Sequence, residues 1–255
     1  MNNSDKKSNK IADLYPMTKF YIAIAFAITT IILPGILPKF IVFLAVNVLA
    51  AASGIYPVFF RRIRNSVGIL FIVLLIVQTL FAPGETVLFS FWIFKAKLEG
   101  LMFALKLGCI LAGVASALVW FFAVTTEKDF VLALEKKGMS PKASYVVLST
   151  LQMVPVLKKR SQTIMNAQRA RGVETEGSLI TRAKVFVPTI IPLVLSSIQG
   201  PEERALTLEA RGFSVDAKKT HLYDIEAKPI DKVVSIVTFC LFGVIIVGRV
   251  LLWVI

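Results

Sequence analysis

Histidine and cysteine are scarce in this chain of 255 residues, which excludes most kinds of metal site. His221 is the only histidine, and no second His or Cys lies near it in the sequence, so we interpret it as a solvated loop residue. Cys109 and Cys240 both fall within apolar runs and are interpreted as small hydrophobic residues rather than as disulfide partners. The sequence therefore predicts no metal centre.

Charged residues are also few, at 18% of the chain, whereas hydrophobic residues make up 56% and the mean hydropathy is +0.74. A soluble protein of this length needs more polar surface than this composition supplies. The net charge of +13 does not indicate a nucleic acid as partner, because the basic residues lie between apolar blocks. The composition predicts an all-α polytopic membrane protein with the lipid bilayer as its surroundings.

Five apolar runs are each interpreted as a transmembrane helix, namely residues 20–33, 40–60, 67–81, 101–124 and 233–255. The third run is shorter than the roughly 20 residues that cross a bilayer, and a polar connection at 82–99 follows it. Residues 1–124 thus hold four helices behind a basic N-terminal tail, and 232–255 hold the last. Small residues at 50–54 and 108–113 predict close packing against another membrane protein.

The positions of Lys and Arg predict the orientation. The N-terminal lysines and Arg61, Arg62 and Arg64 belong inside, which leaves the C-terminus outside after five spans. Residues 125–231 are then a cytoplasmic or interfacial helical coupling module. Its apolar stretches 145–157 and 185–198 are short for a span and are interpreted as helices along or beneath the membrane, with two additional spans as the alternative.

Motifs for chemistry are missing. No Gly-x-x-x-x-Gly-Lys-Ser/Thr segment occurs, so the chain is not expected to hydrolyse ATP itself. No predicted span carries a central acid, and this absence argues against a proton-coupled carrier. Lys106 is interpreted as a side chain that reaches the membrane surface. Glu202 and Glu203 lack the histidines of a metalloprotease motif and are interpreted as acids in the first turn of a helix. These absences predict a non-catalytic subunit.

The tripeptide Ala-Arg-Gly occurs twice, as Ala170-Arg171-Gly172 and as Ala210-Arg211-Gly212. Each copy predicts a helix end, with the glycine in the left-handed conformation and the arginine facing the negative end of the helix dipole. The two helices are predicted to begin at Lys158 and, after a break at Gln199-Gly200, at Pro201. Each guanidinium then offers five donors to the carboxylates or carbonyls of a partner, although two ordinary helix ends remain the simpler alternative.

A resemblance to a known family follows from the motifs Gln168-Arg169-Ala170-Arg171-Gly172 and Glu209-Ala210-Arg211-Gly212. With the proline-containing apolar stretch between them, the last span and the weaker start Pro16-Met17-Thr18-Lys19, they resemble the transmembrane T component of energy-coupling factor (ECF) transporters. These are prokaryotic importers of vitamins and metal ions. The resemblance covers nearly the whole chain, but Tyr15 stands where the family often has histidine.

The resemblance implies an energy-coupling scaffold in a prokaryotic cell membrane. In that family the T component holds two ABC ATPase subunits, which bind the ATP, and a substrate-binding S component, which sets the specificity. The implied contact residues are Ala170, Arg171, Gly172, Ala210, Arg211 and Gly212 with their neighbours Arg169 and Glu209. Each arginine would enter a groove on one ATPase, and the chain would carry no cofactor of its own.

Two alternatives belong to other classes of protein. A membrane enzyme or protease with a basic lipid-facing surface would act when purified alone, whereas a coupling subunit would copurify with ATPases. A secondary transporter would show inverted repeats, and the two halves of the sequence show no such symmetry.

Overall fold

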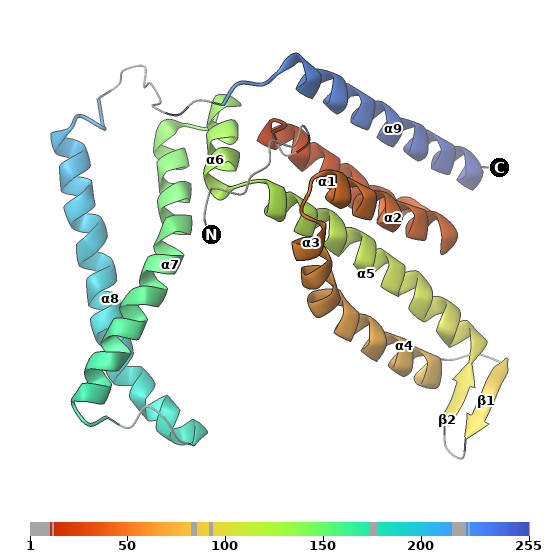
Figure 1. The fold of residues 1–255 in the computed structure, drawn as a ribbon, viewed down its shortest axis with the longest axis horizontal. Helices are drawn as coiled ribbons and strands as arrows, with labels where there is room; N and C mark the ends of the chain where they lie inside the picture. The colour runs from red at the N-terminus through yellow and green to blue at the C-terminus, as the bar shows by residue number, and fades with distance from the viewer. Residues whose placement is uncertain are drawn as a thin grey trace. The chain divides into compact units, whose positions relative to one another are not determined.

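The computed structural model describes residues 11, 13–82, 86–91, 94–173, 178–215, 223 and 225–254. They belong to two compact units, unit 1 from Met1–Leu134 with Ile225–Ile255 and unit 2 from Glu135–Asp224. Most of the described residues are helical (Figure 1), which confirms the predicted all-α class. A short two-stranded hairpin in unit 1 is the addition that the sequence did not predict.

Unit 1 is a bundle of mostly apolar helices. Its helices are α1 (Pro16–Ile32), α2 (Leu37–Ala52), α3 (Tyr56–Ile63), the π-helical segment η2 (Arg64–Gly68), α4 (Ile69–Phe81), α5 (Leu98–Val124), α6 (Glu127–Lys136) and α9 (Pro229–Val254). Helix α5 packs against α1, α2, α3 and α4, and α9 packs against α1 (Figure 1). Three described stretches are long and apolar enough to span a membrane, at Tyr56–Phe81, Leu98–Val124 and Pro229–Arg249, whereas α1 and α2 are shorter apolar helices.

Glycines allow the close packing of α5 within unit 1. A Cβ at Gly108 would overlap the ring of Phe71 on α4, and a Cβ at Gly113 would overlap Thr30 on α1. Both glycines are buried. The prediction that this stretch packs against another membrane protein is therefore wrong for these two positions, because helices of the same chain already occupy them.

The predicted span at 40–60 is wrong, because the chain turns at residues 53–55. Helix α2 ends at Ala52, the Ser53 hydroxyl donates a hydrogen bond of 2.7 Å to the Leu49 carbonyl, and Gly54 has a φ of 72°. Such a positive φ favours glycine and ends the helix. A new helix then runs without a break from Tyr56 to Phe81, so the arginines at 61–64 lie within it and do not end a span.

One end of unit 1, which we call the junction end, is where α1 and α9 begin and α2 and α5 finish. There the Trp120 indole donates a hydrogen bond of 3.0 Å to the Ser53 hydroxyl, and the Lys19 ammonium lies 3.5 Å from the Val124 carbonyl. Phe130 of α6 packs its ring against Phe121 at 5.4 Å. These contacts join the ends of α1, α2, α5 and α6 to one buried cluster.

The predicted polar connection at 82–99 contains the hairpin. Its strands β1 (Val87–Phe91) and β2 (Phe94–Lys97) are antiparallel. The first strand is rich in the aromatic and β-branched residues that favour extended structure. Thr86 donates a hydroxyl hydrogen bond of 2.6 Å to Glu99, which ties the hairpin to the start of α5.

Unit 2 contains two long helices, α7 (Pro141–Ala170) and α8 (Leu179–Ala210), which pack against each other. The predicted helix start at Lys158 is wrong, since Ser140 caps α7 by accepting a hydrogen bond from the Ala143 amide and Pro141 occupies the first turn. The predicted break at Gln199-Gly200 is also wrong, because α8 continues through Pro201. The stretches 145–157 and 185–198 thus lie inside these two helices.

Candidate functional site

Helix α7 ends at Ala170 in a Schellman motif, with Arg171 as the capping residue. Gly172 has a φ of 82°, the Val173 amide donates to the Gln168 carbonyl at 3.1 Å, and the Gly172 amide donates to the Arg169 carbonyl at 2.9 Å. This pair of hydrogen bonds satisfies carbonyls that the helix itself leaves unpaired. The backbone after Arg171 is therefore held in one conformation.

Helix α8 ends at Ala210, and Arg211 follows it with the same hydrogen-bond pattern. Gly212 has a φ of 74°, the Phe213 amide donates to the Leu208 carbonyl at 3.0 Å, and the Gly212 amide donates to the Glu209 carbonyl at 2.9 Å. The predicted left-handed glycine is confirmed at both sites. Arg171 and Arg211 occupy equivalent positions, one residue before the turn, and we call the two helix termini that carry them the arginine ends.

Both arginine ends are open to solvent. Their eight residues are all exposed: Arg169, Ala170, Arg171, Gly172, Glu209, Ala210, Arg211 and Gly212. Among the described residues, the structure records no hydrogen bond from the guanidinium of Arg171 or of Arg211. Ten N–H donors, about five on each guanidinium, are therefore available to a partner.

The arginine ends lie at opposite ends of an antiparallel helix pair. Phe213, just after α8, packs its ring 5.3 Å from that of Tyr145 in the second turn of α7. At the other end, the Gln168 amide donates a hydrogen bond of 3.3 Å to the Pro188 carbonyl in the first half of α8. Figure 1 shows α7 in green and α8 in cyan to light blue crossing each other.

Proline explains why the Pro188 carbonyl is available to Gln168. In a regular helix the amide of residue 192 would donate to this carbonyl, but Pro192 has no N–H. Gln168 supplies the missing donor from α7. The glutamine of the motif 168–172 thus has a visible structural role, which is to bind the arginine end of α7 to the proline-containing part of α8.

Arg160 binds the two helices together at the middle of their contact. Its guanidinium donates a hydrogen bond of 2.6 Å to the Ser196 carbonyl. Gly200, one turn further along α8, makes room for this group, since a Cβ there would lie 3.2 Å from a guanidinium nitrogen. No contact of Arg160 was predicted from the sequence, although a glycine inside a helix is a signal of close packing.

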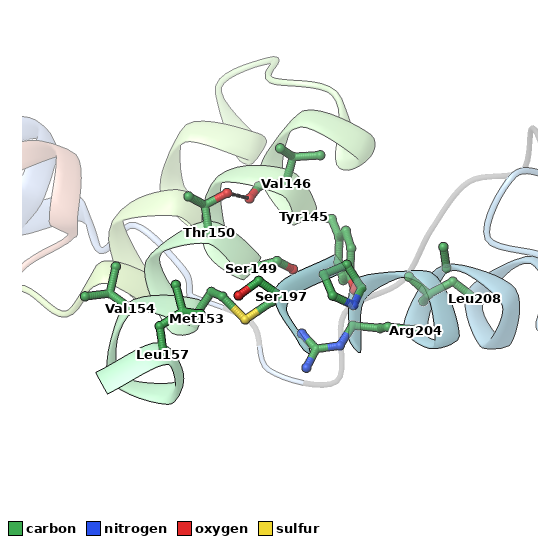
Figure 2. Close-up of a pocket in the computed structure, with 12 residues that line it drawn as sticks. Tyr145, Val146, Ser149, Thr150, Met153, Val154, Leu157, Ser197, Arg204 and Leu208 are labelled. Carbon is green, nitrogen blue, oxygen red and sulfur yellow. Dashed lines mark hydrogen bonds between the residues drawn. The ribbon is translucent and has the colours of Figure 1, made fainter. Parts of the chain in front are cut away.

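An apolar groove runs between α7 and α8 toward the arginine end of α8, and Figure 2 shows its lining residues. Its volume is about 470 Å³. Helix α7 contributes Tyr145, Met153 and Leu157 among others, and α8 contributes Pro201 and Leu208. The lining residues Val146 and Val154 are themselves exposed, and further exposed apolar side chains on α8 are Ile191, Val194, Leu195 and Ile198. Such a surface is unusual for a unit that faces water alone and is typical of contact with another protein or with a membrane.

Comparison with known proteins shows one consistent similarity. Residues 7–222 match a family described as cobalt transport protein (CbiQ), and the matched segment includes both Ala-Arg-Gly tripeptides. The chain is similar to the energy-coupling factor transporter transmembrane protein EcfT of Streptococcus equi subsp. equi (strain 4047), with 32% identity over 204 residues, 72% of this chain and 74% of that protein. The EcfT of Leuconostoc gelidum subsp. gasicomitatum is 30% identical over 190 residues, 71% of this chain and 68% of its own length. The EcfT of Lactococcus lactis subsp. cremoris (strain MG1363) is 28% identical over 214 residues, 78% of each chain.

Proposed function

The chain belongs to the CbiQ family and is a transmembrane T component of ECF transporters, and we propose that it couples two ABC ATPase subunits to a substrate-binding S component. One observation carries this proposal. Two helices of a single scaffold end in the same Schellman motif, and each presents an exposed arginine at the same position. Two equivalent contacts suit a pair of equivalent partners.

In the proposed mechanism, Arg171 and Arg211 each bind one ATPase through charge-assisted hydrogen bonds. The ATPases bind the ATP, and this chain contributes no cofactor. Closure of the ATPase pair moves the two arginine ends, which lie at opposite ends of the α7 and α8 pair. The contact of Arg160 with Ser196 lies between those ends, so the two helices turn about it.

The S component is proposed to bind the apolar residues that α7 and α8 expose. Val154 on α7 is 64% exposed and Ile198 on α8 is 60% exposed, which leaves a large apolar area for a partner to cover. Substrate choice among vitamins and metal ions then belongs to the S component. We also propose that residues 125–231 lie in the cytoplasm of a prokaryotic cell and that the chain crosses its plasma membrane several times.

Alanine substitution of the two arginines tests the proposal. Truncating one partner of a buried charge pair costs on the order of 2 to 5 kcal/mol, so Arg171→Ala and Arg211→Ala are each expected to weaken ATPase binding. The double variant loses both contacts of a bivalent scaffold and is expected to lose the complex. The measurements are capture of the ATPases in mild detergent and ATP-dependent uptake in vesicles.

The matched control removes two exposed charges from the middle of α7, by Lys158→Ala with Lys159→Ala. This variant is expected to retain the ATPases. Wild-type capture and uptake by the double arginine variant would overturn the proposal and leave the two motifs as ordinary helix ends.

A further inference from the structure

An exposed basic patch, formed by Arg61, Arg62 and Arg64, lies on the helix that runs from Tyr56 to Phe81. We propose that this patch binds the phosphate headgroup of an anionic phospholipid and fixes the depth of the helix in the bilayer. The proposal concerns unit 1 alone and does not depend on the ATPase contacts of the arginine ends.

The length of the helix places the patch at a membrane surface. The helix has 26 residues, or about 39 Å at 1.5 Å per residue, which exceeds a hydrocarbon core of roughly 30 Å. Its far end lies beside the start of α5, because a Cβ at Gly100 would overlap the Gln78 carbonyl. The exposed, charged residue Glu99 lies at that level, and we place the membrane surface there. Counting about 20 residues back from Phe81 reaches Arg62, which is where the hydrocarbon core ends on the opposite side.

The packing of the helix turns the patch away from the protein. Phe59, Ile63 and Val67 are buried at successive steps of four residues and form the side that faces the core. The π-helical segment at 64–68 has more residues per turn than an α-helix, which keeps Val67 on the same side as the other two. The arginines are left on the outer sides of the helix, away from the buried core.

The residues around the patch are those of a membrane interface. Tyr56 and Phe60 stack with ring centroids 5.9 Å apart, and they are 43% and 47% exposed. Aromatic side chains of this kind are enriched at the level of the headgroups. On the other side of the patch, the helix from Ile69 to Phe81 has no buried residue and consists almost entirely of apolar side chains.

The chemistry of the patch fits a phosphate. Three guanidinium groups within four residues offer planar pairs of N–H donors, which match the oxygens of a phosphodiester. Among the described residues, the structure records no side-chain hydrogen bond or ion pair for Arg61, Arg62 or Arg64. An anionic lipid supplies the missing negative charge, and a zwitterionic lipid supplies less of it.

Native mass spectrometry of the purified full-length chain tests the proposal, with phosphatidylglycerol and phosphatidylcholine added in equal amounts. The wild-type chain is expected to retain phosphatidylglycerol in preference. The triple variant R61Q/R62Q/R64Q is expected to lose at least about tenfold in phosphatidylglycerol binding, with phosphatidylcholine unchanged, because each basic residue near an anionic surface adds to the attraction. The matched control, K136Q/K142Q/K158Q, removes the same charge from exposed positions and is expected to bind as the wild type does.

A second measurement keeps the arginines in place. A photoreactive amino acid at exposed position 66 is expected to crosslink phosphatidylglycerol in preference to phosphatidylcholine in mixed bilayers, whereas one at exposed position 76 shows no preference.

Equal lipid binding by the triple variant and the wild type would overturn the proposal. Displacement of the lipid by excess inorganic phosphate would also overturn it, because the ligand would then be a free anion. A loss of ATPase capture by the triple variant in lipid-free detergent would assign the patch to a protein partner instead.

Discussion

Tyr15 and Asp231 are 216 residues apart in the sequence, yet the Tyr15 amide donates a hydrogen bond of 2.8 Å to the Asp231 carboxylate. The other carboxylate oxygen accepts a hydrogen bond of 2.8 Å from the Lys228 amide. Tyr15 and Lys228 immediately precede α1 and α9, so one carboxylate caps the N-termini of two helices. Asp231 is only 3% exposed, and its negative charge lies at the positive ends of both helix dipoles.

Asp231→Ala is therefore expected to destabilise unit 1 by about 2 to 4 kcal/mol, since two helices lose a cap and a buried amide loses its acceptor. Asp231→Asn keeps one acceptor oxygen and is expected to cost about half as much. Thermal unfolding in detergent, followed by tryptophan fluorescence, measures the difference. Glu202→Ala, an exposed acid on α8, is the control, and equal midpoints for this control and Asp231→Ala would refute the double cap.

Ser53 and Trp120 provide a second test of the junction end. Trp120 is fully buried and donates its indole N–H to the Ser53 hydroxyl, so Ser53→Ala leaves this donor without an acceptor. We expect a loss of about 1 to 3 kcal/mol. Adding Trp120→Phe removes the donor, so the double variant is expected to lose less than the sum of the single losses. The same unfolding assay measures this coupling, and strict additivity would show that the hydrogen bond contributes nothing.

Much of the architecture could be predicted from the sequence because apolar runs and helix stop signals are local properties. The runs at 20–33, 67–81, 101–124 and 233–255 correspond to α1, α4, α5 and α9, whereas the run at 40–60 covers most of α2 and the start of α3. Both Ala-Arg-Gly tripeptides end helices as predicted. The proposed binding role of Arg171 and Arg211 came from the pairing of these two motifs, and it remains a prediction.

The errors arose where tertiary contacts replace a local hydrogen bond. A break was predicted at Gln199-Gly200 with a new helix from Pro201, but α8 continues through it. Further back in α8, Gln168 of the neighbouring helix donates to the Pro188 carbonyl that Pro192 leaves free. The error at residues 53–55 has a local cause instead, because Gly54 ends α2 inside an apolar run, where hydropathy alone shows no boundary. The pairing of Tyr15 with Asp231 also depends on long-range packing, which no short motif records.

The glycines of α5 differ from those of α9 in a way that packing explains. A Cβ at Gly100 would overlap a backbone carbonyl, which cannot move aside as a flexible side chain can, whereas a Cβ at Gly243 would meet no atom within 4 Å. Gly100→Ala is therefore expected to destabilise unit 1 by about 1 to 3 kcal/mol. Gly243→Ala is expected to be neutral or stabilising by up to about 1 kcal/mol, since alanine has the higher helix propensity. Detergent unfolding midpoints in the opposite order would contradict the tight contact between α4 and α5.

The glycines at the arginine ends are expected to control ATPase affinity through the backbone. Gly172 and Gly212 have open space around an added Cβ, with the nearest atom 3.5 Å away at Gly212, so the effect of alanine there is the strain of a positive φ rather than a clash. This strain is about 1 to 2 kcal/mol per residue and is smaller for asparagine. If the strain opens the Schellman motif, the arginine before it loses its fixed direction.

We expect Gly172→Ala and Gly212→Ala each to weaken ATPase binding by roughly 5- to 30-fold, the factor that corresponds to 1 to 2 kcal/mol, with the asparagine variants closer to the wild type. Titration of labelled ATPase subunits onto the purified chain in detergent measures these affinities. Gly138→Ala is the matched control, because Gly138 also has a positive φ of 115° and open space but precedes α7 rather than following an arginine. It is expected to lose stability and to keep its ATPase affinity. A similar loss of affinity in this control would assign the effect to general destabilisation of unit 2. Unchanged ATPase affinity in Gly172→Ala and Gly212→Ala would mean that ATPase binding does not require the capped helix ends.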